Sequence, residues 1–233
     1  MLLDHLAELI RHSRAGMDDL SPIDIGTEFE KIYGRLDEND FVIDNEFHRA
    51  RGFRKLHLET AIMGGGLDIL HCVFFPDPTF DLPIFGVDIV NSPSGISAAI
   101  VDLSPVSSDL PKSFISELER FSFPPFKKSR ELPSWGDIFS GYVKFVRPEG
   151  EKEEQLFFDI TEFYLKTLIK CLREIKPDLY NSSPTINRYK AQQYYCLQQK
   201  QNDKTRNLLM KAFNAQWADL YMEKVLFDSP PSI

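Results

Sequence analysis

The chain has 233 residues, of which 42% are hydrophobic, and its formal net charge is -8 at pH 7. This length suits one large domain or two small ones, and the apolar content can form a core without disulfides or metal. The acidic balance argues against a protein whose whole surface binds nucleic acid or an anionic membrane.

The three cysteines are widely spaced and outside any CxxC motif, at Cys72, Cys171 and Cys196. This usage is typical of reduced thiols in a cytoplasmic protein. No run approaches the roughly 18 apolar residues of a membrane span, and the first residues lack the basic and apolar regions of a secretory signal. We therefore expect a cytoplasmic protein that does not insert into a membrane.

The first predicted elements are a helix and a strand. Apolar residues recur at helical spacing over residues 2–14 and predict an amphipathic helix. They are Leu2, Leu3, Leu6, Leu9 and Ile10. A polar stretch containing Gly and Pro follows, and residues 40–49 have the composition of a strand.

The most regular pattern lies in the middle of the chain, where four runs are rich in β-branched and aromatic residues. These runs span residues 53–62, 67–75, 83–91 and 96–103. The breakers between them are too short to hold crossover helices. The runs are therefore predicted to form an antiparallel meander.

Helical patterns dominate the rest of the chain, with one short strand predicted over residues 141–146. The predicted helices span residues 112–122, 151–175, 185–200 and 204–226. Asp203 is the expected N-cap of the last helix. Strands in one block, with helices before and after it, predict an α+β layered fold. No linker divides the pattern, so we expect a single domain over residues 1–233.

Alternation along the first meander strand predicts which side chains share a face. One face carries Phe53, Lys55, His57, Glu59 and Ala61, and the other carries Arg54, Leu56, Leu58 and Thr60. His57 and Glu59 are therefore neighbours on one face. A solvated strand face would carry the same residues, so alternation alone leaves a surface role and a functional role open.

The next two strands add a histidine and an acid. His71 shares a face with apolar residues, which fits either a core histidine or a catalytic one. Asp88 lies in an apolar run, where a carboxylate is costly to bury unless it is paired or protonated. The sequence contains no GxGxxG in a nucleotide-binding context, no P-loop, no GxSxG and no metal-ligand spacing. Two histidines and two carboxylates on three adjacent strands suit proton transfer to a bound organic molecule.

Several blocks, in order along the chain, resemble the ferredoxin-dependent bilin reductases. The central blocks are Phe53–Glu59, Gly66–Val73 and Leu82–Val90. Further blocks are Gly95–Ile100, Asp102–Pro105, Arg130–Gly136, Gln201–Arg206 and Val225–Asp228. The resemblance covers most of the chain and is looser over residues 1–50 and 148–190.

The resemblance implies a three-layer α/β/α sandwich, with a central antiparallel sheet flanked by helices and a bilin held between the sheet and the C-terminal helices. It also implies reduction of biliverdin IXα in single-electron steps by reduced [2Fe-2S] ferredoxin. It implies no tightly bound cofactor and no metal. Ferredoxin and the bilin are the expected partners, and we expect a monomer.

Position by position, the resemblance assigns proton transfer to Glu59, His71 and Asp88, with His57 in a supporting role. Glu59 corresponds to the acid associated with reduction of the exocyclic vinyl group, which implies phycocyanobilin as the product. Other positions correspond to substrate contacts. Ser97, Arg147 and Lys204 match contacts to the propionates, and Asn202 and Asp203 match a polar pair on the C-terminal side of the pocket.

Three alternatives stay open. A sister enzyme that makes phycoerythrobilin would share the fold, the partner and the substrate, and Glu59 argues against it. A bilin carrier without redox turnover is expected to replace Asp88 or His71, and both are present. An unrelated α+β interaction domain would require all the matching blocks to coincide by chance.

Docking of an acidic ferredoxin onto a chain of net charge -8 requires a local basic face. The candidates are Arg49, Arg51, Arg54 and Lys55, then Lys127, Lys128 and Arg130, then Lys200, Lys204 and Arg206. Their convergence on one surface near the pocket is a hypothesis.

Overall fold

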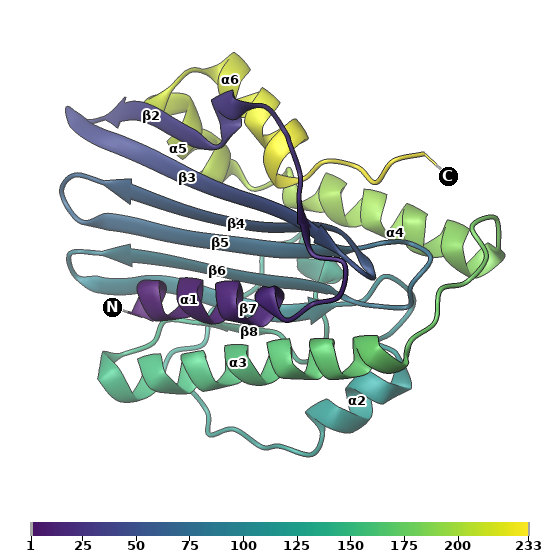
Figure 1. Ribbon diagram of the computed structural model, residues 1–233. Helices are drawn as coiled ribbons and strands as arrows, with labels where there is room; N and C mark the ends of the chain where they lie inside the picture. The colour runs from purple at the N-terminus through teal and green to yellow at the C-terminus, as the bar shows by residue number, and fades with distance from the viewer. Residues whose placement is uncertain (1, 233) are drawn as a thin grey trace.

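The computed structural model describes residues 2–232 and is built around one antiparallel sheet of eight strands (Figure 1). The strand order is β1-β3-β4-β5-β6-β7-β8, and β2 also pairs with β3. The strands are β1 (Ser21–Pro22), β2 (Lys31–Leu36), β3 (Asn39–Ala50), β4 (Phe53–Met63), β5 (Leu67–Pro76), β6 (Ile84–Ser92), β7 (Gly95–Ser104) and β8 (Lys144–Val146).

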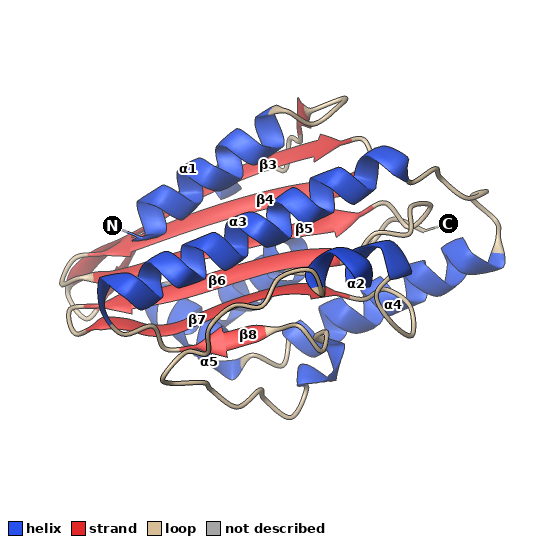
Figure 2. Cartoon of the chain, turned by 90° about the horizontal axis from the view of Figure 1, so that it is seen from below, coloured by secondary structure: helices blue, strands red, loops and turns tan. Residues whose placement is uncertain are grey.

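Helices cover both faces of this sheet, which confirms the three-layer sandwich (Figure 2). They are α1 (Leu2–Ala15), α2 (Lys112–Leu118), α3 (Gly150–Glu174), α4 (Ser183–Gln199), α5 (Asp203–Ala212) and α6 (Ala215–Tyr221). Short 3-10 turns occupy Thr27–Phe29 and Gly136–Ile138, and a π-helical turn, Met222–Leu226, follows α6. α2 and β8 are shorter than the predicted ranges 112–122 and 141–146.

The predicted meander is confirmed, because β4 to β7 are consecutive antiparallel neighbours. The sequence analysis missed β2, which forms a hairpin with β3. The turn between them consists of Asp37 and Glu38, with φ of 47° and 67°. Such a two-residue turn usually contains glycine. Its signal was therefore weak in this sequence.

The single helix predicted over residues 204–226 is wrong, because the structure divides this range into α5, α6 and the π-helical turn. The side chain of Asn214 accepts a hydrogen bond from the backbone N–H of Trp217 and begins α6. The N-cap of α5 is Asn202 rather than the predicted Asp203. Asparagine and aspartate cap helices about equally well, so residue type alone did not distinguish these two neighbours.

The alternation predicted for residues 53–61 is broken at one position. β4 pairs with β5 through Phe53 and then through Lys55, which leaves Arg54 between them in a β-bulge. Phe53 therefore packs with Leu56 in the core beneath α1 and α3. Arg54 shares with Lys55 the opposite face, so the faces predicted for Phe53 and Arg54 are wrong.

Two separate hydrophobic cores lie on the two faces of the sheet. The α1/α3 face packs against α1, α2 and α3, and its strand residues include Leu56, Leu58, Leu70, Cys72, Phe74 and Phe85. The α4/α6 face packs against α4, α5, α6 and the π-helical turn, and its strand residues include Phe41, Ile43, Phe47, Val73 and Phe75.

The α4/α6 face is incompletely covered over β6 and β7. Residues that point to this face are only partly buried, namely Gly86, Asp88, Val90, Ala98 and Ile100. The alternating residues on the α1/α3 face are fully buried, namely Val87, Ile89, Ala99 and Val101. The sheet therefore leaves a mostly apolar, accessible floor with one carboxylate on it.

Candidate active site

A row of polar side chains crosses the α4/α6 face. Strand pairing places Glu59 of β4 opposite His71 of β5, and His71 opposite Asp88 of β6. Asn45 of β3 is the partner of Glu59 on its other side. We call these four residues the polar row. His57 precedes Glu59 by two residues on the same face, so the structure brings together the three residues predicted to transfer protons and the supporting histidine.

His71 and Asp88 form the accessible end of the polar row. Nδ1 of His71 lies 2.5 Å from Oδ1 of Asp88. Burial by itself lowers the pKa of His71, but the charge of Asp88 and this hydrogen bond, with a smaller contribution from Glu59 when it is ionised, outweigh it. The pKa of His71 is therefore raised above its ordinary value, which favours the imidazolium.

Asp88 is more exposed than the sequence analysis assumed. Its side chain is 43% exposed, because no helix covers the α4/α6 face at this point of β6. The premise of a deeply buried carboxylate is therefore wrong. The exposed position lets Asp88 reach a ligand that lies on the floor while it stays hydrogen-bonded to His71.

Glu59 is the buried acid of the site, at 7% exposure. The hydroxyl of Tyr221 donates a hydrogen bond to Oε2 of Glu59 at 2.7 Å. Burial raises the pKa of Glu59 above its ordinary value, and the charge of His71 and the hydrogen bond from Tyr221 oppose this only in part. Glu59 is thus favoured as a protonated carboxyl, which can donate a proton.

His57 is held in one tautomer by Asn45. The amide nitrogen of Asn45 donates to the hydroxyl of Tyr221 at 2.8 Å, so its amide oxygen serves as an acceptor. Nε2 of His57 lies 2.8 Å from that oxygen and must carry the proton. Burial, together with the charges of Lys55 and His71, lowers the pKa of His57 well below its ordinary value. His57 is therefore neutral, with a lone pair on Nδ1.

Two ring nitrogens of the site are buried without a hydrogen-bond partner among residues 2–232, namely Nδ1 of His57 and Nε2 of His71. The two rings meet edge to face with centroids 5.6 Å apart. Each ring therefore keeps one buried nitrogen that no other residue of this range occupies. Because His57 is fully buried and Glu59 nearly so, a solvated strand face is excluded for them.

Ser97 lies at the edge of the floor, in a β-bulge of β7. Its hydroxyl donates to the carbonyl of Val90 at 3.1 Å, and its own carbonyl accepts from Arg130 at 2.5 Å. The guanidinium of Arg130 also lies over the ring of Phe145, 5.2 Å from its centroid. The structure therefore adds Arg130 to the residues around Ser97.

The other predicted substrate contacts lie outside the polar row. Arg147 is exposed after β8, and Asp203 and Lys204 are exposed at the start of α5. Asn202 is partly buried, and its side-chain oxygen caps α5. Hydrogen bonds and ion pairs within residues 2–232 connect none of them to the polar row. Their contact with substrate stays a prediction.

The sequence analysis missed Asn45, Tyr221 and the place of Arg130 in the site. Asn45 carried a signal, because it is the polar member of an alternating apolar face formed by Phe41, Ile43 and Phe47. Tyr221 carried none, because it is 162 positions from Glu59 in the sequence and meets it only through the fold.

The predicted basic docking face is largely occupied by contacts within the chain. Arg51 donates to the carbonyls of Leu172 and Ile175 near the end of α3. Other candidates form ion pairs within the chain: Arg54 and Lys55 with Asp228, Lys128 with Glu149, Lys200 with Glu223, and Arg206 with Asp219. Arg49, Lys127 and Lys204 are exposed. Convergence of all ten cations on one free surface is therefore wrong.

Within the part of the chain that is described, no group of three or more His, Cys, Asp or Glu side chains could hold a metal ion. In the same residues, every helix is too short or too polar to cross a membrane. The three cysteines are free and buried.

Comparison with known proteins identifies the family. The family described as ferredoxin-dependent bilin reductase matches residues 7–228. The phycocyanobilin:ferredoxin oxidoreductase of Prochlorococcus marinus (strain MIT 9303) is 54% identical over 232 residues, which cover 100% of this chain and 88% of that protein. The protein of the same name from Synechococcus sp. (strain CC9902) is 51% identical over 231 residues, which cover 99% and 94%.

A solved structure supports the fold independently. Phytochromobilin synthase from tomato, solved in complex with biliverdin, matches with a TM-score of 0.75 and 16% identity, over 97% of this chain and 82% of that one. The two chains thus share the three-layer fold although only 16% of their aligned residues are identical. With a family match over nearly the whole chain and relatives above 50% identity, this chain belongs to the ferredoxin-dependent bilin reductases.

Proposed function

We propose that this protein reduces biliverdin IXα to phycocyanobilin with electrons from reduced ferredoxin. Relatives named for this reaction are more than half identical to it over almost its full length. The observation that carries the proposal is the row Glu59–His71–Asp88, which lines up two acids and a protonatable base beside an open apolar floor.

The reaction consumes four electrons and four protons, so proton supply is what the protein must provide. Four ferredoxins are each oxidised by one electron, and each pair of electrons enters the pigment with two protons. A plant-type iron–sulfur donor has a potential near about −400 mV and transfers one electron at a time. Adding an electron to a neutral pigment in an apolar site creates an unscreened anion, and proton transfer from a neighbouring donor removes that cost.

His71 and Asp88 supply protons to the ring nitrogens and the carbonyl end of the pigment in this proposal. Asp88 reaches the floor, and His71 holds a proton because its pKa is raised. The neutral His57 supports the site by packing its ring against that of His71. These roles are supported by the hydrogen bond at 2.5 Å and by the burial of both rings.

Glu59 protonates the exocyclic vinyl group in this proposal, which directs the reaction to phycocyanobilin. Its support is chemical, since a buried carboxyl with a raised pKa can deliver a proton to carbon when an electron arrives. Tyr221 keeps the carboxyl oriented through its hydrogen bond.

The propionates of the pigment are held, we propose, by Ser97 and by cations at the edge of the floor. Arg130 joins the predicted Arg147 and Lys204 as a candidate because it already contacts Ser97. A guanidinium can bind a carboxylate through two parallel hydrogen bonds, and an ammonium acts as a point charge. Asn202 and Asp203 complete the C-terminal side of the pocket in the same proposal.

Ferredoxin docks, we propose, at exposed cations that leave the internal ion pairs intact. Arg49 and Lys127 are exposed, and Lys127 lies close to the β8 edge, where residue 129 bridges to residue 146. Electrons pass directly to the pigment, without a resident cofactor. The protein acts as a cytoplasmic monomer in this proposal, and free cysteines are usual in the cytoplasm.

The test combines the purified protein, biliverdin, reduced ferredoxin and a regenerating system under anaerobic conditions, followed by chromatography of the pigment. Accumulation of phycocyanobilin is expected. Accumulation of phycoerythrobilin would overturn the role given to Glu59 and favour a sister enzyme. Biliverdin that binds but stays unreduced with competent ferredoxin would overturn the reductase function and favour a carrier.

A further inference from the structure

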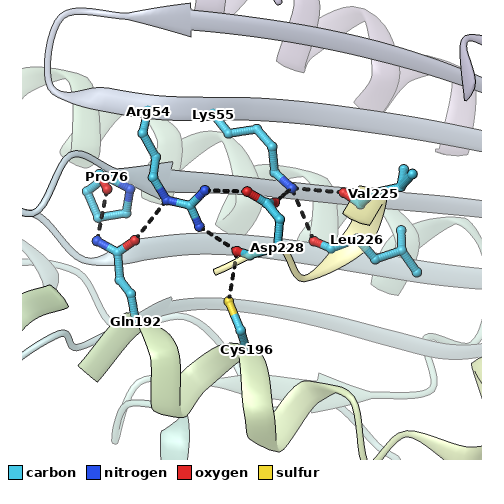
Figure 3. Close-up of polar contacts among 8 residues, drawn as sticks. All are labelled: Arg54, Lys55, Pro76, Gln192, Cys196, Val225, Leu226 and Asp228. Atoms are coloured by element: carbon cyan, nitrogen blue, oxygen red, sulfur yellow. Dashed lines mark hydrogen bonds and ion pairs between the residues drawn. The ribbon is translucent and has the colours of Figure 1, made fainter. Parts of the chain in front are cut away.

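A segment near the C-terminal end of the chain returns to the sheet beside the polar row. Residues Val225–Asp228, here called the C-terminal segment, lie against β4, where two adjacent cations hold them (Figure 3). The ammonium of Lys55 donates to the carbonyls of Val225 and Leu226 at 2.8 and 3.4 Å, and it also contacts the carboxylate of Asp228.

Arg54 binds the far end of the C-terminal segment. Its guanidinium donates to Oδ2 of Asp228 at 2.7 Å and to the carbonyl of the same residue at 2.9 Å. Its Nε donates to the amide oxygen of Gln192 at 3.1 Å, and Gln192 donates to the carbonyl of Pro76. Both cations also lie over the ring of Phe75. The β-bulge that turns Arg54 onto this face makes the arrangement possible.

The three charged groups depend on one another. Burial disfavours the charge of Asp228, but the charges of Lys55 and Arg54 outweigh it and lower the pKa of the carboxyl. Lys55 and Arg54 are almost fully buried, at 7% and 9% side-chain exposure. Loss of Asp228 would leave two buried cations with backbone and amide oxygens as their remaining partners.

Phe227 lies between these anchors and packs against the site. It is 4% exposed, and its ring meets the imidazole of His71 at 83°, with centroids 5.7 Å apart. The ring of His57 also packs against His71. Two rings therefore confine an imidazole whose Nδ1 is hydrogen-bonded to Asp88 and whose Nε2 is buried.

We propose that Phe227 is a positioning residue for pigment reduction. Held by the cluster of Lys55, Arg54 and Asp228, it fixes the imidazole of His71 against Asp88 and keeps water from its buried side. A phenyl ring can neither donate nor accept the reaction's protons, so Phe227 acts through His71. This inference rests on the proposed function, which makes His71 a proton donor.

The test measures exchange of the His71 ring protons with water by NMR of the pigment-free, ¹⁵N-histidine-labelled full chain. The spectrum of His71→Gln assigns the signal. Phe227→Leu opens one side of the imidazole, so we expect exchange to quicken by about tenfold or more. The less disruptive Phe227→Met provides a second variant. Asp228→Asn, which loosens the segment without touching His71, should also quicken exchange.

The matched control is Phe41→Leu, which removes the same atoms from the same hydrophobic core at a residue that contacts Phe213 rather than His71. We expect this variant to lose stability but to keep slow exchange at His71. Unchanged exchange in Phe227→Leu and Phe227→Met, or equal acceleration in Phe41→Leu, would overturn the positioning role. Unchanged exchange in Asp228→Asn would show that the cluster of Lys55, Arg54 and Asp228 does not hold Phe227 in place.

Activity separates this inference from the function on which it rests. Phe227→Leu should reduce biliverdin roughly tenfold to a hundredfold more slowly, because a misplaced reacting group is costly. If exchange responds as expected while the unsubstituted chain fails to reduce biliverdin, the positioning role stands and the proposed function fails. If exchange responds but the Phe227→Leu rate equals that of the unsubstituted chain, the positioning does not serve this reaction.

Discussion

The two faces of the sheet differ although the same strands build both. The α1/α3 face is apolar on the central strands, with Leu56, Leu58 and Cys72 buried against α1 and α3. The α4/α6 face carries His57, Glu59 and His71 at the intervening positions of the same strands, and most of it is equally buried. Successive residues of one strand therefore alternate between side chains that pack the core and side chains proposed to take part in the reaction.

The comparison shows what a buried polar face requires. Leu56 and Leu58 need only apolar neighbours, whereas Glu59 and His57 need partners that satisfy their polar atoms. Tyr221 and Asn45 provide most of them, and Lys55 finds its oxygens on the C-terminal segment. The helices over this face are thus part of the site rather than a cover over it.

The largest effect on the reaction rate is expected from His71 of β5. Its neighbour Cys72 points to the opposite face and serves as the control. His71→Gln removes a proton donor and should slow pigment reduction by roughly 10²–10⁴-fold, the usual contribution of a general acid or base. Cys72→Ala, its control on the α1/α3 face, should lower the melting temperature and leave the rate unchanged. Anaerobic kinetics of both variants make the comparison, and equal rates in the two would contradict it.

Replacement of the buried acid Glu59 should change which bilin is formed and leave binding of biliverdin intact. Glu59→Gln keeps an oxygen that accepts from Tyr221 but removes the carboxyl proton. We expect a partly reduced bilin with its vinyl group intact to accumulate, because only the vinyl reduction loses its donor. Chromatography of the pigments measures this, and normal yields of phycocyanobilin would remove Glu59 from the mechanism.

The ion cluster should affect stability more than any exposed ion pair does. Asp228→Asn breaks a largely buried cluster and should lower the free energy of unfolding by about 3 kcal/mol, near the low end for such pairs because Asp228 is 31% exposed. Asp219→Asn breaks the exposed pair with Arg206 and should lower stability much less, because solvent screens that pair. Denaturant titration of both variants is the measurement, and equal losses would contradict the difference in burial.

The pH dependence of stability should report on His71. Because its folded pKa is raised, the stability it contributes is fully present below its ordinary pKa of about 6.5 and is lost as pH rises through the folded value. Asp88→Asn removes the main cause of the rise, so the loss should move to lower pH. NMR titration of His71 in both proteins checks this, and an unmoved midpoint would show that Asp88 does not set it.

The smallest effect is expected from Glu59 on stability. Its folded pKa is also raised, so its contribution is present below its ordinary value of about 4.3 and declines as pH rises through the folded pKa. In Glu59→Gln, stability should therefore fall less steeply as the pH rises above about 4.3. Thermal melts from pH 4 to pH 8 measure this dependence. An equal slope in the variant and in the unsubstituted chain would show that the pKa of Glu59 is not raised by folding.

Strand periodicity predicted the meander, the shared face of His57 and Glu59, and the adjacent strands that carry His71 and Asp88, because a period of two depends only on local geometry. It failed at Arg54, where a β-bulge adds a residue without a sequence signal. The burial of Glu59 and the exposure of Asp88 could not be predicted, because they depend on where α4 to α6 lie. Tyr221 and Phe227 join the site only through contacts between distant parts of the chain.

The most direct test of the central claim, that the polar row supplies the protons of reduction, is a comparison of the unsubstituted chain with Asp88→Asn. Each is loaded with biliverdin, supplied with reduced ferredoxin under anaerobic conditions and followed by absorption. The account predicts that both bind the pigment, that the unsubstituted chain converts it to phycocyanobilin, and that Asp88→Asn stops at biliverdin or at a pigment radical. Full conversion by Asp88→Asn would contradict the account.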